Sequence, residues 1–440
     1  MTDKVLPLAH HLRRHKRNVR RYTSAIRSGD GKQIRVALNR LLNSHSSKVV
    51  AATEAIRPRK VKTNLSADSL AKKIDVWKPC DEKAFVSAIP KSNSEDYRLV
   101  VSFGAENRTR QVLVLNALKC HWNISDDQTV FNGGTAEAIR RVKKNYANGF
   151  THFLEVDVYQ CFDRFDIEGV ARFLSMPEKV TDNVLSGRSL NIVPSNSTRN
   201  DVVPESQDNR ETPMELFQEH FRLEWDPDQQ GLIQGSKASP YAAELLLAPV
   251  CIAVSECGSG MVVNYADNFF LMAKSHGELS NLNKILGESL RAHPAGPLLG
   301  QFMPESITPG ASFEILGYKL LPKNGKLRVK MSTKNQAKAR SIRRKTYRVL
   351  NSKMPLHLKI RAFESLQKDH KSLVYAFTEW KKGKQYHEKK MRPLRELIAA
   401  ATLEAMPPVR RRVRAPRSAV ETRPATEMPL PQVRRRVRKA

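Results

Sequence analysis

The feature that most constrains the fold is a pair of apolar segments that each lead to an aspartate. Residues 261–273, MVVNYADNFFLMA, read as two strands around Asp267, a pattern typical of a hairpin. Residues 151–158, THFLEVDV, alternate like a buried strand and carry Asp157 near their end. If these strands lie side by side, the two carboxylates repel unless a cation joins them, and hard oxygen ligands favour Mg²⁺. Strand-end aspartates also occur simply as turn residues, and either aspartate alone leaves that interpretation open.

The distribution of charge predicts a polyanionic partner. The net charge is +31 over 440 residues, with +10 in residues 1–50, +19 in 319–400 and +9 in 410–440. The interior, 51–318, has a net charge of −6. Basic ends around a mildly acidic centre favour a protein that binds nucleic acid with its outer parts.

The cysteines and the apolar runs limit the cellular location that we expect for the chain. The five cysteines form no CxxC pair and no zinc-type cluster, which predicts reduced thiols and a cytoplasmic location. The N-terminus lacks the apolar core of a signal peptide, and the longest apolar stretch, 244–254, is too short to cross a bilayer. We therefore expect no membrane partner.

The chain divides by composition. Residues 12–62 read as basic helices with a Gly-Asp break at 29–30, whereas 312–322 read as a strand and 332–400 as strongly basic helix. Residues 187–213 are polar and aperiodic, which predicts a flexible insertion. The Arg- and Pro-rich end, in which PPVRRRVRAP returns as PQVRRRVRKA, predicts a disordered tail.

Three separated stretches together carry a family resemblance. They are Asp157-Val158 with Phe162-Asp163, the run from Gly231 to Pro240, and Tyr265-Ala266-Asp267-Asn268. They resemble motifs A, B and C of reverse transcriptases of the group II intron and bacterial retroelement type. Motif C here is the variant YADN.

Further elements in the same order extend the resemblance over residues 97–320. Phe313 to Tyr318 resembles the primer grip, and Tyr97-Arg98 resembles the strand whose arginine meets the incoming triphosphate. Asn107 to Gln111 resembles the segment that follows that strand, and the basic N-terminal helices resemble this group's N-terminal extension.

The resemblance implies an α+β right-hand polymerase fold with fingers, a palm containing an antiparallel sheet, and a helical thumb. The divisions expected on that basis are a basic helical extension at 1–62, fingers at 63–150, a palm at 151–320 with the insertion at 187–213, a thumb at 321–400, and the disordered tail at 401–440.

The implied activity is RNA-directed DNA polymerisation by two-metal nucleotidyl transfer. Asp157, Asp267 and Asn268 would be the catalytic residues. Asp157, Asp267 and the backbone carbonyl of Val158 would hold two Mg²⁺ ions, with Mn²⁺ as an alternative ion. The implied partners are an RNA template, a nucleic-acid primer and nucleoside triphosphates.

The other implied roles concern the substrates. Leu316 and Gly317 would support the primer end, while the nucleotide would be bound by Arg98, Arg108, Phe162, Gln234 and Gly235. Phe162 stands five positions after Asp157, where the family carries an aromatic ring beneath the sugar that leaves no room for a 2′-OH. This register favours deoxynucleotides, although a purely structural core role for Phe162 stays open.

Three departures keep other readings open. Ile233 replaces the usual proline, Glu244 replaces a common asparagine, and Asn268 replaces the second aspartate of motif C. Asn268 keeps a carbonyl oxygen but removes a negative charge. The alternatives are an RNA-dependent RNA polymerase of a small RNA virus and a catalytically weakened RNA-binding relative. The sequence leaves the oligomeric state unknown.

Overall fold

The computed structural model describes residues 6–57, 63–90, 97–121, 124–195, 231–302 and 309–404. Ten strands lie in three sheets: β1 (Cys80–Pro90), β2 (Tyr97–Ser102), β3 (His152–Val158), β4 (Leu190–Pro194), β5 (Met261–Tyr265), β6 (Asn268–Ala273), β7 (Gly300–Phe302), β8 (Phe313–Ile315), β9 (Tyr318–Lys323) and β10 (Lys326–Met331). The helices of the N-terminal half are α1 (Leu8–Ser28), α2 (Gly31–Asn43), α3 (His45–Ile56), α4 (Ala67–Lys73), α5 (Ala105–Leu118), α6 (Gly134–Ala147), α7 (Ile167–Phe173), α8 (Glu178–Val180) and the π-helix η1 (Thr181–Leu185). Those that follow are α10 (Ser239–Glu256), α11 (His276–Arg291), α12 (Thr333–Leu350), α13 (Leu356–Tyr375) and α14 (Gly383–Glu404).

The N-terminal helices confirm the break that the sequence predicts at 29–30. Gly29 ends α1 in the left-handed conformation, with φ of 70°. Asp30 begins α2 as its N-cap, because its carboxylate accepts hydrogen bonds from the backbone N–H groups of Lys32 and Gln33 at 2.8 and 3.1 Å. Apolar side chains of α1, α2 and α3 then share one core with α5 and with the central sheet.

The central sheet has four antiparallel strands in the order β5-β6-β3-β7. Successive side chains along each strand point to opposite faces of the sheet. Leu154 and Val156 join the large core that contains α10 and α11, whereas Phe153 and Phe270 join the second core with α6. Asp157 therefore lies on the same face of β3 as Phe153.

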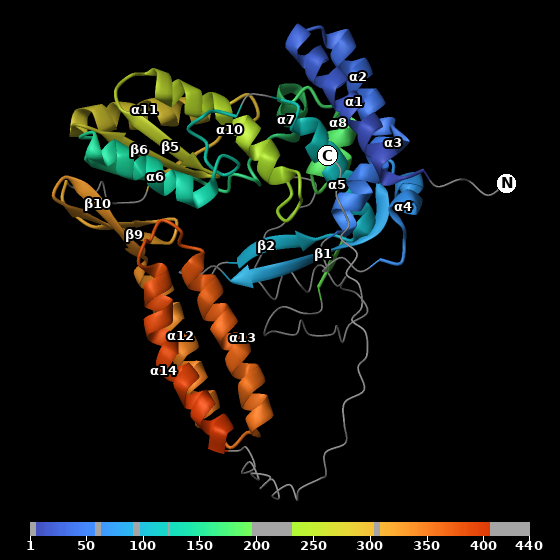
Figure 1. Ribbon diagram of the computed structural model, residues 1–440. Coiled ribbons are helices and arrows are strands. Elements are labelled where there is room, and N and C mark those ends of the chain that lie inside the picture. The colour runs from blue at the N-terminus through green and yellow to red at the C-terminus, as the bar shows by residue number, and fades with distance from the viewer. Residues whose placement is uncertain are drawn as a thin grey trace, which may run out of the picture.

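The two faces of the central sheet are covered differently. Figure 1 shows α10 and α11 on one side and α6 on the other, with the β9–β10 hairpin beyond α6. The β1–β2 hairpin crosses below this layer and leads toward the N-terminal helices. The motif A and motif C strands are thus held between helices on both faces of the sheet (Figure 1).

One part of the predicted insertion is regular structure. Leu190–Pro194 form β4, which pairs in parallel with β1 in the three-stranded sheet β2-β1-β4. Residues 190–194, which the sequence predicts as part of a flexible insertion, are thus a strand, since backbone pairing orders a short segment with no clear alternation. Residues 196–213 lie outside the described part of the chain.

The strand predicted over 312–322 is a hairpin. β8 and β9 pair antiparallel around a turn at Leu316 and Gly317, and β9 continues into the β9–β10 pair. The helix predicted over 332–400 begins with α12 at Thr333, and the first residues of the predicted thumb, from 321, are strand because residues up to Met331 belong to the sheet.

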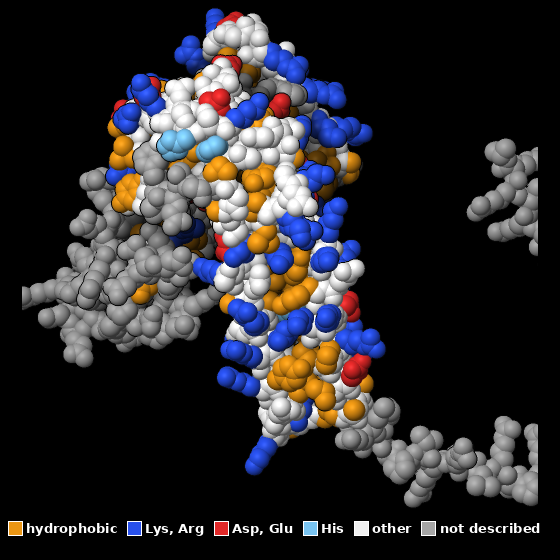
Figure 2. Space-filling view, turned by 90° about the vertical axis from the view of Figure 1, so that its left-hand side faces the viewer, with side chains coloured by type: hydrophobic (Ala, Val, Ile, Leu, Met, Phe, Trp, Pro, Cys, Tyr) orange, Lys and Arg blue, Asp and Glu red, His pale blue; other side chains and the backbone are white. Residues whose placement is uncertain are grey.

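The three C-terminal helices α12, α13 and α14 pack against one another. α12 carries seven Lys or Arg residues and no acidic residue. Figure 2 shows Lys and Arg side chains along these helices, with few acidic ones among them. α14 extends to Glu404, so the predicted tail is helical over its first four residues, and residues 405–440 lie outside the described part. In the described residues we find no helix with the length and apolarity needed to cross a bilayer.

Candidate polymerase active site

The two aspartates of motifs A and C lie side by side. β3 pairs with β6 so that Asp157 stands opposite Asn268, the residue next to Asp267. The backbone N–H of Val158 donates to the carbonyl of Asp267 at 2.9 Å. The structure thus brings together the strand ends that the sequence predicts to meet, while the catalytic roles of these residues stay predictions.

Asn268 acts on Asp267 through its amide. Its Nδ2 donates to Asp267 Oδ1 at 3.0 Å. Behind the turn, buried Asn264 donates from Nδ2 to the carbonyls of Ala266 and Asn268 at 2.9 and 3.1 Å. Ala266 takes φ of 54°, a conformation that this turn requires. Asn268 in this structure orients the Asp267 carboxylate, so its nitrogen rather than its oxygen faces the carboxylate pair.

The donor set fits Mg²⁺ that is completed by substrate. In the described part of the chain, no group of three or more His, Cys, Asp or Glu side chains could hold a metal ion. Mg²⁺ is usually held by one or two carboxylates together with substrate phosphates and water, and Asp157 with Asp267 supply such a pair. The carbonyl of Val158, the third predicted ligand, accepts a bond from Cys161 N at 3.2 Å and keeps a second lone pair.

A positive charge faces this pair. Burial raises the pKa of Asp267, and its own backbone N–H, Arg98 and the Asn268 amide each lower it in part. Arg98 lies on β2 opposite Ile89, so the β1–β2 hairpin delivers a guanidinium toward motif C. This cation can neutralise either the carboxylate or an incoming phosphate.

Two further carboxyls, those of Glu244 and Glu155, lie near the site, and the sequence does not predict that proximity. Glu244 on α10 is 2 % exposed, and neither of its oxygens has a hydrogen-bond partner of good geometry among the described residues. Burial raises the pKa of Glu244 to about 7, with Asp267 raising it further and the Ala266 backbone N–H lowering it. Burial, together with Asp157, also raises the pKa of Glu155 to about 7. A charged residue within an apolar helix was the available indication for Glu244.

The elevated pKa of Glu244 predicts a pH-dependent cost in stability. An unfolded glutamate ionises near its ordinary pKa of 4.5, so between that pH and about 7 the folded protein binds more protons than the unfolded chain. Folding stability then falls as pH rises through this window. Glu244→Gln removes the cost, and its stability gain over the wild type should be larger at pH 8 than at pH 5 by roughly 2 kcal/mol.

Urea unfolding at both pH values in EDTA measures this difference. Glu256→Gln is the matched control, because Glu256 lies exposed near the end of the same helix. A gain that is equal at pH 5 and pH 8, or one shared by the control, would contradict the assignment.

The motif B loop is fixed against motif A by backbone bonds. Leu232 N donates to Phe162 O at 2.7 Å, and Gln234 Nε2 lies 3.3 Å from an Asp163 carboxylate oxygen. A Cβ on Gly231 would lie 2.3 Å from Phe162 O, so only glycine permits this approach. Phe162 is half-buried and packs against the main core, and its role at the sugar stays a prediction.

The same loop also contacts the β1–β2 sheet. Val101 N donates to Gln234 O at 3.0 Å, and Gly235 takes φ of 100°. A Cβ on Gly235 would lie 2.1 Å from Val101 O. Motif B is therefore held between β2, which carries Arg98, and the motif A turn.

Helix α5 completes this side of the site. Glu82 caps it by accepting from the backbone N–H groups of Glu106 and Asn107 at 3.1 and 2.8 Å. Half-buried Arg108 has no hydrogen-bond partner at its buried Nε among the described residues. Gln111 Oε1 accepts from Lys237 N at 3.1 Å and so ties α5 to motif B.

The predicted primer-binding residues form the β8–β9 turn. Leu316 and Gly317 both have positive φ, 47° and 79°. Gly317 O accepts from Ser332 N at 2.8 Å and from Asn335 Nδ2 at 3.1 Å. This turn is thereby attached to the start of α12, so the predicted primer end and the basic helices are mechanically linked.

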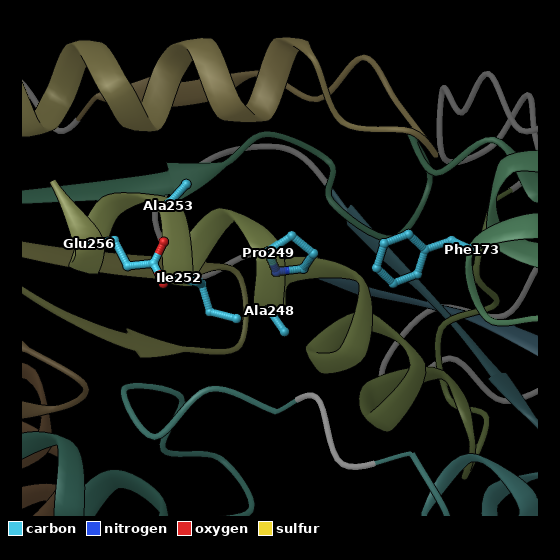
Figure 3. A pocket seen from close by; sticks show the side chains of 6 residues that line it. All are labelled: Phe173, Ala248, Pro249, Ile252, Ala253 and Glu256. Carbon is cyan, nitrogen blue, oxygen red and sulfur yellow. The ribbon is translucent and has the colours of Figure 1, made fainter. Parts of the chain in front are cut away.

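An apolar pocket of about 320 Å³ is separate from this site. It lies between Phe173 and the outer side of α10, where Pro249 and Ile252 line it (Figure 3). None of the predicted catalytic or nucleotide-binding residues lines it. The candidate site is therefore the polar junction of motifs A, B and C.

Comparison with known proteins agrees with this geometry. Residues 89–295 match the family model described as "Reverse transcriptase (RNA-dependent DNA polymerase)". The matched segment contains motifs A, B and C together with β2 and α5. Among curated proteins, no sequence matches the chain.

Two of the similar solved structures are fungal telomerases. One, from Candida albicans in complex with a TWJ fragment of telomeric RNA, shows 13 % identity and a TM-score of 0.34, and the match covers 73 % of this chain. The other, apo telomerase from Candida tropicalis truncated from the C-terminal domain, shows 11 % identity, a TM-score of 0.34 and 58 % coverage. The chain spans 60 % and 56 % of the length of these two proteins. The family match and the mixed helix and strand architecture together give the α+β right-hand polymerase fold that the sequence predicts.

Proposed function

We propose that this chain, in which residues 89–295 form a reverse transcriptase domain, copies RNA into DNA by metal-dependent nucleotidyl transfer. The observation that carries the proposal is the placement of Asp157 opposite Asn268, with Asp267 adjoining and Arg98 near enough to lower the pKa of Asp267. An acidic pair beside a phosphate-binding cation is the minimum that phosphoryl transfer needs from the protein. The order of the motifs favours the group II intron and bacterial retroelement type.

The residues have distinct tasks in this reaction. Asp157 and Asp267 would hold two Mg²⁺ ions, which when bound lower the pKa of the primer 3′-OH and neutralise the leaving pyrophosphate. Arg98 and Arg108 pair with the triphosphate, because guanidinium groups match phosphate geometry. Asn268 positions Asp267, to whose carboxylate it donates. Gly235 allows the backbone to approach the templating base pair closely.

The basic helices α12–α14 suit the product duplex. Their Lys and Arg side chains can follow phosphates without reading sequence (Figure 2). The β8–β9 turn, bonded to the start of α12, would place the primer end relative to this duplex. The RNA template, the primer and the nucleoside triphosphates are therefore the proposed partners.

Primer extension tests the proposal and its substrate preference. With an RNA template, a DNA primer and Mg²⁺, we expect extension with dNTPs and at least about a hundredfold slower extension with NTPs. A clash of a few kcal/mol between the Phe162 ring and the 2′-OH of an NTP is enough for this difference in rate. Phe162→Val should raise NTP use relative to dNTP use. Phe165→Val, which alters a buried aromatic three residues away, is the control.

The outcomes of this experiment are distinct. Extension with NTPs alone would indicate an RNA polymerase, and no extension with either substrate would remove the proposed activity. An unchanged NTP-to-dNTP ratio in Phe162→Val would assign Phe162 to the core rather than to sugar selection.

A further inference from the structure

The N-terminal helices contain a basic pocket far from the carboxylate site. The pocket has a volume of about 420 Å³ and lies where α1, α2 and the start of α3 meet. Four arginines line it: Arg14, Arg17 and Arg21 from α1, and Arg40 from α2. Figure 1 shows these helices at the opposite end of the molecule from α12–α14. We call this site the arginine pocket.

The arrangement follows from helix periodicity. Arg14, Arg17 and Arg21 are spaced three and four residues apart, so they share one face of α1. The buried residues of α1, among them Asn18, Tyr22 and Ala25, form a stripe directly beside this face and pack toward the rest of the protein. Packing of α1 on the rest of the protein therefore directs the three guanidinium groups toward the same concave surface.

The charge of the four arginines has no internal compensation, although Asp68 pairs with His45, which also lines the pocket. No Asp or Glu lines it, and none of the four arginines has an ion-pair or hydrogen-bond partner among the described residues. Arginines elsewhere do pair, as Arg141 does with Asp127 and Glu137. Four uncompensated cations around one concavity repel each other, and a bound polyanion would relieve that repulsion.

Two neutral features of the pocket also suit an anion. Asn18 lines it at only 8 % exposure, and its amide has no hydrogen-bond partner in the described structure. Ser44, the N-cap of α3, also lines the pocket and makes no side-chain cap bond. The first-turn N–H groups and the positive end of the α3 dipole are consequently available to a ligand.

We propose that the arginine pocket binds phosphate groups of RNA at a site separate from the polymerase centre. Guanidinium groups bind phosphate in a bidentate fashion, and the Asn18 amide can donate beside them. No Phe, Tyr or Trp is among the residues that line the pocket, and its two histidines already have partners, since His11 is buried and bonded to Ser46 and His45 pairs with Asp68. Recognition is therefore through phosphate, either of the backbone or of an RNA end, without reading sequence.

The pocket is rigidly connected to the polymerase domain. α1 packs on α3, and α3 packs on α5, the helix that carries Arg108 and Gln111. Trp77 Nε1 donates to Asn43 Oδ1 at 2.9 Å and fixes the end of α2. RNA held in the pocket would thus be held at a constant position relative to the active site.

RNA binding by the full-length chain without nucleotides tests the proposal independently of catalysis. The pocket variant carries Arg14→Gln, Arg17→Gln, Arg21→Gln and Arg40→Gln. Its matched control carries Arg13→Gln, Lys16→Gln, Arg20→Gln and Lys32→Gln, which removes the same charge from exposed positions of the same helices. Thermal unfolding and primer extension at saturating RNA verify that both variants fold.

Fluorescence anisotropy should show about a thirtyfold loss of RNA affinity near 0.15 M salt in the pocket variant and less than about threefold in the control. The slope of log K against log salt should decrease by about 3 for four lost contacts to single-stranded RNA. Asn18→Ala should weaken binding about threefold without changing that slope, since no charge is removed. Equal losses in the pocket and control variants would overturn the proposal.

Three RNAs of one sequence distinguish the source of the phosphate. If the pocket binds backbone phosphates, then 5′-triphosphate, 5′-hydroxyl and circular RNA lose affinity equally. If the pocket binds an RNA end, only the 5′-triphosphate RNA loses affinity in the pocket variant. Either result supports the site. Polyglutamate of equal charge that competes as well as RNA would instead indicate a general anion site and would overturn phosphate recognition.

The polymerase proposal can fail without affecting this one. If the enzyme is inactive but the pocket variant alone loses RNA affinity, the proposal of an RNA site stands and the polymerase proposal fails. If the enzyme is active but the pocket and control variants bind RNA with equal affinity, only the polymerase proposal stands.

Discussion

Asp157→Asn is expected to reduce primer extension by roughly a thousandfold or more, equivalent to about 4 kcal/mol of transition-state free energy. The substitution keeps the shape of the side chain but removes one of two carboxylates that stand side by side on β3 and at the β5–β6 turn. With one carboxylate left, the divalent ions that the reaction requires lose a ligand and a negative charge. The measurement compares the extension rates of the wild type and the variant with Mg²⁺, with their RNA affinities measured in parallel.

The comparison variants make this measurement specific. Glu155→Gln removes a carboxyl from the same face of β3, opposite Phe270, and should keep most of the activity. Asn268→Asp restores a second acidic residue to motif C, and we expect it to retain or raise the rate and to lower the Mg²⁺ concentration needed. Retained activity in Asp157→Asn, or equal losses in Asp157→Asn and Glu155→Gln, would disprove the assignment of the acidic pair.

Gly235→Ala is expected to destabilise the protein by roughly 2–4 kcal/mol and to reduce extension at least about a hundredfold. Two effects add at this position. The residue has φ of 100°, which L side chains rarely adopt, and a Cβ would lie 2.1 Å from the backbone oxygen of Val101. Relief requires the motif B loop to move away from β2, which breaks the bond from Val101 N to Gln234 O.

Gly149→Ala separates the two effects. Gly149 has φ of 92°, but a Cβ there would meet nothing within 4 Å. This control should lose only about 1 kcal/mol of stability and little activity, because backbone strain alone acts. Denaturant unfolding and extension assays on both variants make the comparison. Similar losses of activity in the two variants would show that the approach to Val101 is unimportant for the site.

The sequence predicts the centre of the site well because strand periodicity and charge are local properties. Leu154 and Val156 alternate with Glu155 and Asp157, and this pattern places Asp157 on one face irrespective of the strand's neighbours. The pairing of β3 with β6 then follows from burial of the apolar residues on both strands. The α+β right-hand polymerase fold, by contrast, is predicted by the resemblance of motifs A, B and C rather than by periodicity.

Other features depend on contacts that no local pattern records. β4 is a five-residue strand that is ordered by pairing with β1, and its sequence LNIVP lacks alternation. FEILGYKL reads as one strand, although Leu316 and Gly317 form a turn. The arginine pocket needs three helices, so Arg40 could not be associated with Arg14 from spacing alone.

Glu244 shows most clearly what cannot be predicted from the sequence alone. The sequence reveals a charge inside an apolar helix, but only the packing of α10 against β5 places that carboxyl near Asp267. The burial of this carboxyl, with no partner of good geometry among the described residues, is a property of the assembled core.

The positions of β3 and β6 within the sheet also determine what the protein keeps if it loses its chemistry. Both strands are interior, so their backbone amides are bonded to neighbours and should be among the slowest in the molecule to exchange hydrogen with solvent. The carboxylates are consequently arranged during folding, before metal or nucleotide arrives. An inactivating change at a single aspartate leaves this scaffold intact, and a descendant without polymerase activity could persist as an RNA-binding protein.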